Sequence, residues 1–381
     1  MKIAFFSDTY LPNRDGVVTS ILTLRKALEE RGNEVFIFCS GSRQVKKRNI
    51  DDHVFYHVSI PFKPYPYYKI AFFPFLSERE VEKLGIQLVH SHGLATTGWA
   101  AVWTARSLKL PIITTFHTLI PEAVHYVAKG NRMRRFVKRM AWSYVKFYLK
   151  RSDAVIVPSN VIKDILIKHG VKKEIYSIPS GVDVNRFNPD INSNPIRDLL
   201  GIKDAHLVLY IGRIAKEKNL DVLIKAVPKV LKNLPHCKFV VAGTGPATDY
   251  YKNMVLESNL KESIIFQGYI EDENLAYYYA ASDVFVFPSK FETQGLTALE
   301  AMACGKPVVG ADFLAIKEIV KNGYNGYLFD PDDPDDCAEK IIKTINERSM
   351  MSKNARQTAL KYSIDECADK LLKVYEKYMI K

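Results

Sequence analysis

The stretch FPSKFETQGLTALEAMACGKPVV, residues 287–309, carries the pattern from which the fold is predicted. It begins as a buried strand that stops at Pro288-Ser289, continues as a loop to Gly295, and opens a helix at about Leu296. The first N–H groups of such a helix are free and its dipole favours an anion. A strand that passes through a loop into a helix is typical of α/β proteins.

The same alternation extends along the whole chain. Apolar strands are predicted at 2–7, 33–40, 87–92, 111–117, 153–159, 206–212, 238–243, 263–268 and 283–289. Helical stretches separate them, and the pattern restarts after the polar segment 186–195. We therefore expect an α/β protein of two doubly wound, Rossmann-like domains facing a cleft. The expected domains are 1–190 and 191–363, with the C-terminal helix at about 364–381 packing back on the first.

Composition and charge limit the classes of protein to consider. The chain has 381 residues, of which 47% are hydrophobic and 25% charged, as in a soluble globular protein. No apolar run is long enough to span a bilayer, and the N-terminus reads as a strand rather than a signal peptide. Its five cysteines form no CxxC pair, which predicts reduced cytosolic thiols and no zinc site.

The positive charge is concentrated in one half of the chain. Residues 1–195 hold 29 Lys and Arg against 16 Asp and Glu, whereas residues 196–381 hold 25 against 26. This asymmetry accounts for the whole net charge of +12. It predicts an anionic partner for the N-terminal half.

The two carboxylates of the first stretch are candidate site residues. Glu292 lies at the helix entrance, and Glu300 lies about one turn in. The alternative interpretation is that Glu292 caps the helix and that Glu300 faces solvent. A small apolar run follows Glu300 and suggests a buried flank, where a carboxylate needs partners such as ligand hydroxyls.

Three further segments place polar or small residues just after predicted strands. Arg213 and Lys218 follow the strand at 206–212, where two cations suit a diphosphate. Gly16 lies where the first strand turns into the first helix and lets a ligand approach the backbone. His117 lies at the end of the strand at 111–117. Taken singly, each segment also has a plain interpretation as a solvated loop, a turn or a structural histidine.

Five motifs in a fixed order make the chain resemble a known family. They are GVVTS near Gly16, FHT at His117, SIPSGVDVNRFNP at 177–189, GR…EKN at 212–219 and ETQG…EAMACGKPVV after residue 291. Together they resemble family 4 glycosyltransferases of the GT-B fold, and most closely the branch of diacylglycerol glucosyltransferases. The resemblance implies a retaining enzyme that uses a nucleotide-diphosphate sugar.

The resemblance also implies a role for each candidate. It assigns catalytic roles to His117, Glu292, Arg213 and Lys218, with Arg213 and Lys218 on the diphosphate. Glu292 would bind the donor sugar hydroxyls, and His117 would lie against the transferred sugar. Glu300 would bind the ribose hydroxyls.

The loop before the helix is implied to bind substrate as well. The N–H groups around Gly295 and Leu296 would add to the phosphate site, and Thr293 and Gln294 are assigned to the same substrate-binding set. Gly16 would face the donor from the N-terminal domain.

Two departures and two further patterns need interpretation. Many relatives carry a double glycine where this chain has Asp15-Gly16, and Ser180 replaces a more common Asn. The DxD pattern in DPDDPDD (330–336) reads as a turn with an N-cap Asp rather than a metal site. GTGPAT (243–248) lacks the third glycine of a dinucleotide fingerprint. No metal ligand and no cofactor are therefore expected.

The segment 130–152 is a basic helix with eight Lys and Arg and no acidic residue. Its apolar side chains share one face, which predicts packing on the sheet. The basic side could face water only, bind a nucleic acid, or bind an anionic membrane. Because the sequence has no base-reading motif, we favour the membrane over nucleic acid. The expected membrane residues are Arg132, Arg135, Arg139, Trp142 and Lys146. The aromatic segment 61–75 and the loop with Glu122, His125 and Tyr126 favour a lipid acceptor.

These observations predict a metal-independent, retaining hexosyltransferase. The expected donor is a nucleotide-diphosphate sugar, UDP-linked, and the expected acceptor is a membrane lipid, diacylglycerol first. We therefore expect a cytoplasmic enzyme that binds peripherally to the inner face of the cell membrane. A soluble or polysaccharide acceptor, or a nucleotide-sugar epimerase or hydrolase on the same fold, is the alternative.

Overall fold

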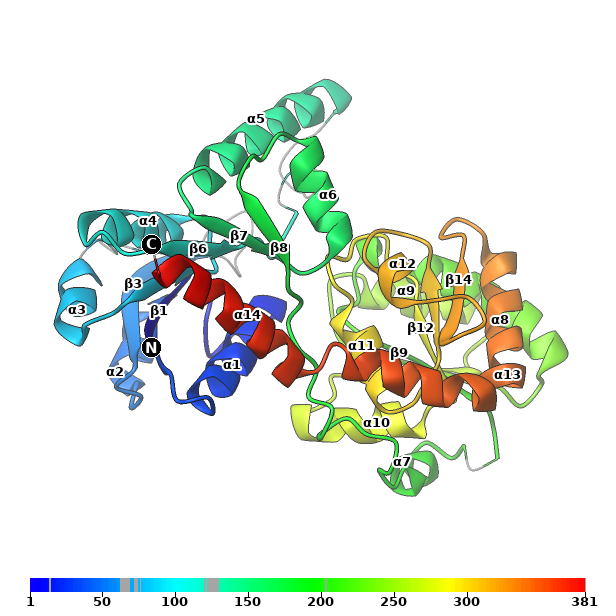
Figure 1. The fold of residues 1–381 in the computed structure, drawn as a ribbon. Coiled ribbons are helices and arrows are strands. Elements are labelled where there is room, and N and C mark those ends of the chain that lie inside the picture. The colour runs from blue at the N-terminus through cyan, green and yellow to red at the C-terminus, as the bar shows by residue number, and fades with distance from the viewer. Residues whose placement is uncertain are drawn as a thin grey trace. The chain divides into compact units, whose positions relative to one another are not determined.

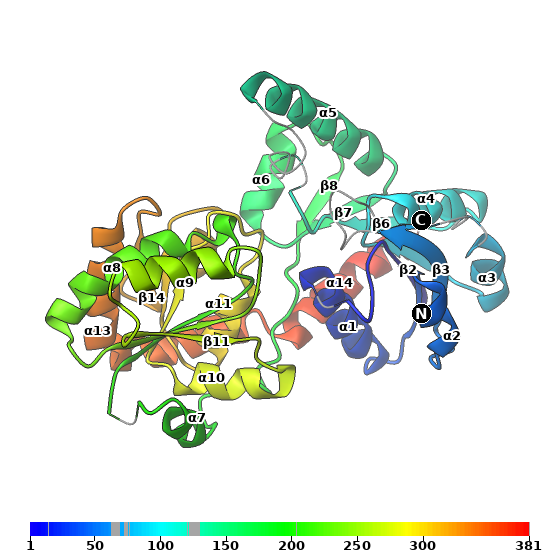
Figure 2. The same cartoon turned by 180° about the vertical axis from the view of Figure 1, so that it is seen from behind.

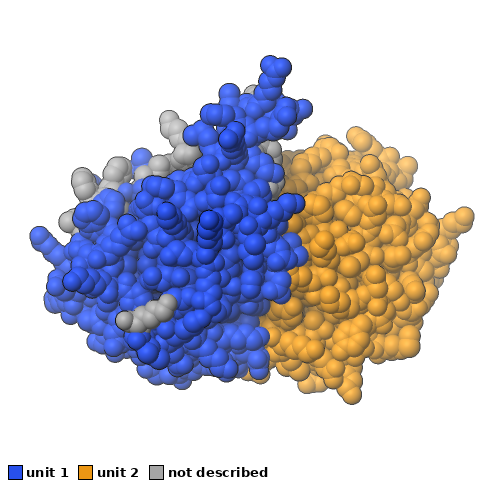
Figure 3. Space-filling view, turned by 45° about the horizontal axis from the view of Figure 1, so that its top comes forward, with its two compact units in different colours: residues 1–181, 364–381 blue, residues 182–363 orange. Residues whose placement is uncertain are grey.

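A computed structural model describes residues 1–13, 15–61, 69–71, 75, 77–119, 121, 130–202 and 204–380. The chain forms two compact units, one of residues 1–181 with 364–381 and one of residues 182–363, which Figure 3 colours separately. Each unit is an α/β structure built on its own sheet (Figure 1). The expected fold class is confirmed: both sheets have the parallel, Rossmann-like arrangement.

The sheet of the first unit has the strand order β4-β3-β2-β1-β5-β6-β7-β8. All neighbours pair in parallel except β3 and β4, which are antiparallel. The strands are β1 Lys2–Ser7, β2 Glu34–Gly41, β3 Val54–Pro61, β4 Lys69–Ala71, β5 Leu88–Ser91, β6 Ile112–Thr115, β7 Ala154–Val157 and β8 Glu174–Ser177. The helices are α1 Gly16–Glu29, α2 Arg43–Arg48, α3 Ser77–Leu84, α4 Thr96–Ser107, α5 Asn131–Leu149, α6 Asn160–Lys168 and α14 Ile364–Met379.

The last helix, α14, belongs to the first unit although it follows the second in sequence. It lies beside α1 (Figures 1 and 2), and its buried Cys367, Leu371 and Tyr375 share a hydrophobic core with the central strands. The Arg31 guanidinium binds the Asp365 carboxylate at 2.8 Å and fixes the start of α14. The helix thereby covers apolar side chains that would otherwise face water.

The second unit is a six-stranded parallel sheet in the order β11-β10-β9-β12-β13-β14. Its strands are β9 Leu207–Ile211, β10 Lys238–Ala242, β11 Ile264–Gly268, β12 Val284–Phe287, β13 Val308–Ala311 and β14 Gly326–Phe329. Its α-helices are α7 Asn194–Leu199, α8 Leu220–Asn233, α9 Thr248–Glu257, α10 Leu275–Ala281, α11 Leu296–Ala303, α12 Ile316–Ile319 and α13 Pro334–Leu360, with 3₁₀ turns η3 Lys216–Lys218 and η4 Asp272–Asn274. Because β9 and β12 are neighbours, their carboxyl ends meet at one sheet edge.

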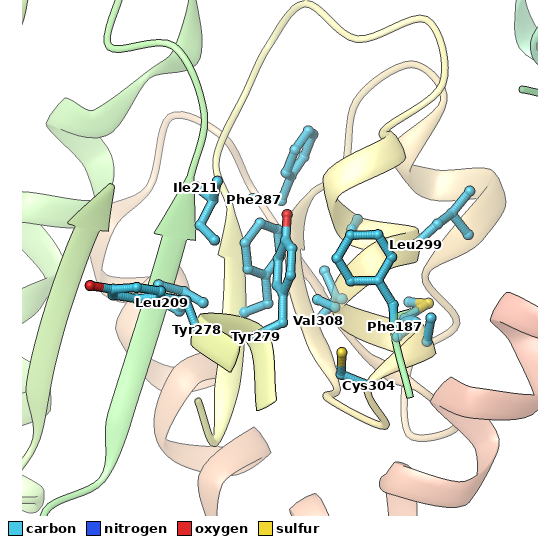
Figure 4. Packing of buried hydrophobic residues seen from close by; sticks show 14 of the residues in the cluster. Phe187, Leu209, Ile211, Tyr278, Tyr279, Phe287, Leu299, Cys304 and Val308 are labelled. Carbon is cyan, nitrogen blue, oxygen red and sulfur yellow. The ribbon is translucent and has the colours of Figure 1, made fainter. Parts of the chain in front are cut away.

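A buried cluster around α10 and α11 supports that edge. Figure 4 shows Tyr279 among Phe187, Leu299 and Cys304, with the ends of β9 and β12 close by. The rings of Phe187 and Tyr279 meet edge to face at a centroid distance of 5.7 Å. Residues 182–190, which the sequence grouped with the N-terminal domain, thus form part of the second unit.

Candidate active site

The loop after β9 brings the expected cations to the sheet edge. Gly212 follows the strand, and the Tyr210 hydroxyl donates to the Arg213 carbonyl oxygen at 3.1 Å. η3 then carries Lys218, and Asn219 adopts the left-handed conformation (φ +56°) to begin α8. Lys218 is largely buried, with 22% of its side chain exposed. A buried ammonium needs a partner, and the neighbouring strand supplies one.

That partner is Glu292, in the loop after β12. The Lys218 ammonium donates to the Glu292 carboxylate, whose side chain is only 18% exposed. Arg213 lies 3.7 Å from Glu217, so a second cation and a second carboxylate stand next to the first pair. The Lys290 amide donates to the Glu217 carbonyl at 3.3 Å and joins the two loops. Four residues of alternating charge therefore form one cluster at the ends of β9 and β12.

Gly295 shapes the start of α11. Its φ of +81° is a left-handed conformation that favours glycine, and a Cβ there would lie 2.5 Å from Ile316 Cδ1. As the N-cap residue it has no side chain to cap the helix, so Leu296 begins an α-helix whose first N–H groups are not bound by a cap side chain. Thr293 and Gln294 are half-buried in the same loop. The geometry provides N–H donors beside the charged cluster.

Glu300 lies farther along α11 and is held by a residue that the sequence analysis missed. Its carboxylate accepts a hydrogen bond of 2.7 Å from the Tyr279 hydroxyl on α10. Burial raises the pKa of Glu300 to about 7, while the Tyr279 bond and the nearby charge of Arg186 act in the opposite direction. The run YYY at 277–279 was the available signal, because a buried tyrosine hydroxyl needs a hydrogen-bond partner.

In the first unit, Gly16 is the first residue of α1, and its surroundings are open. Among the residues that the structure describes, a Cβ at this position would meet nothing within 4 Å, so their packing does not require a glycine. The preceding Asp15 caps the helix and accepts from the amides of Val17 and Val18, both at 2.9 Å. Thr9 Oγ1 donates to the other carboxylate oxygen of Asp15, Oδ2, at 3.0 Å. Because a carboxylate already occupies this helix start, the site suits a sugar better than a phosphate.

His117 follows β6 and contacts a second histidine that follows the neighbouring strand β5. Its Nε2 lies 3.0 Å from Nδ1 of His92. Burial lowers the pKa of His117 to about 4 and that of His92 well below its usual value, so both rings are neutral at pH 7. His117 also lines a small pocket with His90 and Thr115. The alternation in QLVHSH, residues 87–92, was the available signal, since positions i and i+2 share one face of a strand.

Comparison with known proteins identifies the family. The Glycosyltransferase Family 4 pattern matches residues 14–186, and the Glycosyl transferases group 1 pattern matches residues 193–359. An alpha-monoglucosyldiacylglycerol synthase from Streptococcus pneumoniae is 35% identical over 335 residues, which are 86% of this chain and 75% of that protein. The chain belongs to glycosyltransferase family 4. The resemblance seen in the five motifs is thereby confirmed.

Two further matches agree with this family. The alpha-monoglucosyldiacylglycerol synthase of Acholeplasma laidlawii is 30% identical to this glycosyltransferase over 340 residues, covering 86% of this chain and 85% of that protein. The solved structure of Anabaena Alr3699/HepE in complex with UDP-glucose has a TM-score of 0.76 at 19% identity, covering 99% of this chain and 100% of that one. The latter shows that the glycosyltransferase has the same fold.

The helix α5 is arranged differently from the prediction. Met133, Phe136, Met140 and Phe147 were expected to pack on the sheet, but between 53% and 60% of each residue is exposed. Trp142 was expected at the membrane, but it is 5% exposed and stacks on His169 at a centroid distance of 3.7 Å. The helix packs instead through Trp142, Val145, Tyr148 and Leu149, of which only Tyr148 belonged to the expected apolar face. The sequence alone does not show which of two adjacent apolar stripes faces the protein.

The other expected membrane residues of the glycosyltransferase are on the surface. Arg132, Arg135, Arg139 and Lys146 are all exposed, on the side of α5 next to the apolar stripe. No helix within the described ranges is long and apolar enough to cross a membrane. Most of the aromatic segment 61–75, and the loop with Glu122, His125 and Tyr126, lie outside the described residues.

The acidic turn at 330–336 and the glycine-rich segment at 243–248 both have structural explanations. Asp333 is the N-cap of α13 and accepts from the amides of Asp335 and Asp336, as predicted for the acidic turn. A Cβ at Gly243 would lie 1.9 Å from the Gly212 carbonyl oxygen, so that glycine is needed for close packing of two loops. Among the residues that the structure describes, no group of His, Cys, Asp and Glu is arranged to hold a metal ion.

Proposed function

We propose that this glycosyltransferase moves glucose from UDP-glucose to diacylglycerol at a membrane surface, with retention of the anomeric configuration. The arrangement of α5 is the observation that supports a lipid acceptor. Its stripe of exposed Met and Phe side chains runs beside a stripe of exposed Arg and Lys. A helix of this kind lies in the interface of an anionic bilayer, with the apolar side chains among acyl chains and the cations among headgroups. Two relatives bear the name alpha-monoglucosyldiacylglycerol synthase, which agrees with this acceptor.

The donor belongs at the sheet edge of the second unit. Arg213 and Lys218 would bind the diphosphate, and the N–H groups at the start of α11 would add to that site. Glu292 would accept hydrogen bonds from hydroxyls of the donor sugar, and Glu300 from those of the ribose. The UDP-glucose complex of a protein with the same fold supports this choice of donor.

The chemistry that these groups supply is electrostatic. When the bond between the sugar and the diphosphate breaks, negative charge grows on the leaving oxygen. Two fixed cations and aligned N–H groups stabilise that charge without a metal. In this structure the Lys218 ammonium is held by Glu292, so the cation is in place before the donor binds. We assign no residue as a covalent nucleophile. We propose that the acceptor hydroxyl attacks the anomeric carbon from the face of the leaving group, as the bond to the diphosphate breaks, and that its proton passes to the departing diphosphate oxygen, with Gly16 and His117 taking part from the first unit.

A panel assay tests the proposal. The enzyme is incubated with UDP-glucose, UDP-galactose, GDP-mannose and UDP-N-acetylglucosamine, each with diacylglycerol vesicles, with a soluble sugar, or with no acceptor. The products are identified by mass. A glycolipid from UDP-glucose and diacylglycerol is expected. If only the soluble sugar is glycosylated, the acceptor is a soluble sugar and not a lipid. Donor consumption without any acceptor would indicate a hydrolase or epimerase.

A further inference from the structure

A pair of histidines in the first unit has a hydrogen-bond arrangement that restricts its chemistry. His92 follows β5 and His117 follows β6, and these strands are neighbours in the sheet. Nδ1 of His92 lies 3.0 Å from Nε2 of His117. A neutral imidazole has one N–H donor and one acceptor nitrogen, so only one of the two rings can donate across this contact.

The surroundings of His92 decide which ring donates. His92 is 5% exposed, and its ring lies 4.7 Å from the Phe5 ring and 4.1 Å from the His90 ring between centroids. Its second nitrogen, Nε2, is buried and has no hydrogen-bond partner among the described residues. His90 differs, because its two nitrogens meet the hydroxyls of Tyr375 and Thr115.

If His117 donated, the proton of His92 would have to sit on the buried Nε2. That would leave an N–H donor without a partner, which is the rarer and costlier defect in folded proteins. If His92 donates from Nδ1, its Nε2 carries only a lone pair, and every N–H of His92 is bonded. The second arrangement is therefore the stable one.

We infer that His92 is a positioning residue which donates from Nδ1 to Nε2 of His117 and so fixes His117 as the tautomer protonated at Nδ1. His117 then presents an N–H donor on its other nitrogen. It cannot act as a general base through Nε2, whose lone pair is already bound. This inference rests on the proposed function only in its consequence. In the transfer reaction, His117 would therefore not remove the acceptor's proton through Nε2.

The tautomer is measured on the free enzyme, without any substrate. The chain has nine histidines, and ¹⁵N labelling of their rings gives separate shifts for protonated and unprotonated nitrogens. The His117 signals are assigned by comparison with His117→Gln. We expect a protonated Nδ1 and an unprotonated Nε2 at pH 7 in the wild-type enzyme and in His92→Asn, whose amide can donate from nearly the same position. A wild-type His117 protonated at Nε2 would overturn the inference.

A kinetic comparison separates positioning from a purely structural role. His92→Leu should lower kcat by roughly three- to tenfold, the loss expected for one neutral hydrogen bond. His92→Asn should recover most of that loss, with KM for UDP-glucose little changed in both. His57→Leu is the matched control, since His57 is a half-buried histidine on β3 that bonds Ser77 at 2.7 Å. Equal losses in His92→Asn and His92→Leu would contradict a positioning role. A correct tautomer in an enzyme that transfers no hexose would refute the proposed function alone.

Discussion

Lys218 and Glu292, 74 residues apart in sequence, form an ion pair at the carboxyl ends of neighbouring strands β9 and β12. Each group is mostly buried, so each depends on the other for neutralisation. The cation proposed for the diphosphate is thus already bound to the carboxylate proposed for the sugar. This relationship makes separate predictions for the two residues.

The change Glu292→Gln should damage turnover without weakening nucleotide binding. Removing charge-assisted bonds to sugar hydroxyls costs about 1.5–3 kcal/mol, or about ten- to a hundredfold in kcat/KM. Free UDP should bind equally well or more tightly, because Lys218 no longer has a competing anion. Initial rates with UDP-glucose and calorimetry with UDP measure the two effects. A variant with wild-type kcat/KM would remove Glu292 from the site.

The changes Lys218→Ala and Arg213→Ala should weaken UDP-glucose and free UDP together, because both ligands carry the diphosphate. A tenfold or greater loss of UDP affinity is expected from about 1.5–3 kcal/mol per charged bond. Lys225→Ala, on α8, is a control that alters a lysine of the same unit. Full activity in excess EDTA should accompany the wild-type result. Unchanged UDP affinity in both site variants, measured by calorimetry, would show that the diphosphate binds elsewhere.

Glu300 should make nucleotide binding depend on pH near neutrality. Its pKa is about 7, and only the carboxylate can accept bonds from both ribose hydroxyls. Between pH 8 and pH 6 the ionised fraction falls about tenfold, so the Kd for UDP should rise by about that factor. UDP phosphate also titrates in this range, and Glu300→Gln supplies that background. Identical pH profiles for the variant and the wild type would contradict the assignment.

The raised pKa of Glu300 should also make the stability of the folded enzyme depend on pH. Because its pKa in the folded enzyme lies above the ordinary value of 4.5, the folded state binds the proton more tightly than the unfolded chain does. The free energy of unfolding should therefore fall as the pH rises from 4.5 through 7. Urea denaturation of wild type and Glu300→Gln across this range measures it, and the difference between the two should shrink as the pH falls. A constant difference would show that the pKa is not raised.

Gly16 should be replaceable for folding but not for activity. Gly16→Leu adds a side chain into space where a Cβ has no neighbour within 4 Å, so the melting temperature should stay near that of the wild type. Activity should fall because the side chain occupies the proposed approach of the sugar. Gly295→Ala is the contrasting variant and should lower the melting temperature, since it combines a φ of +81° with a Cβ 2.5 Å from Ile316. A fully active Gly16→Leu would place the sugar elsewhere.

The basic stripe of α5 should bind anionic vesicles. Replacing Arg132, Arg135, Arg139 and Lys146 by Gln should remove about 4 kcal/mol of attraction, at about 1 kcal/mol per cation, or about a thousandfold in partition. Binding of the wild type should fall as salt rises. A matched control replaces four other exposed cations, Arg43, Lys46, Lys47 and Arg48 of α2, which changes the net charge equally. Equal sedimentation of both quadruple variants with vesicles would show that α5 is not the membrane surface.

Much of the fold could be predicted from sequence because strand and loop signals are local. Apolar runs such as KIAFFS at 2–7 and the loops that follow them gave the positions of nine strands. The packing of α5 could not be predicted, because two adjacent stripes of the helix are apolar and contacts with α4, β5 and His169 at the end of α6 determine which one is buried. Phe136 and Trp142 exchange their expected roles for this reason.

The candidate site shows the same division. Arg213, Lys218, Glu292 and Gly295 could be found because each follows a strand in a recognisable loop. Their pairing could not, since it depends on β12 lying next to β9, which follows from the strand order of the folded sheet. The supporting residues His92 and Tyr279 were missed because each acts through a contact with a residue that is distant in sequence.

Retaining transfer of glucose to diacylglycerol is tested by the product that the enzyme forms from UDP-glucose and diacylglycerol in anionic vesicles. The mass of the purified lipid product is measured by mass spectrometry and its anomeric centre is examined by proton NMR, with Glu292→Ala as the control of lowered activity. We expect a monoglucosyldiacylglycerol whose anomeric proton shows the α configuration of the donor. A β-linked product would contradict retention, and the absence of any glucosylated lipid from the folded enzyme would contradict the proposed function.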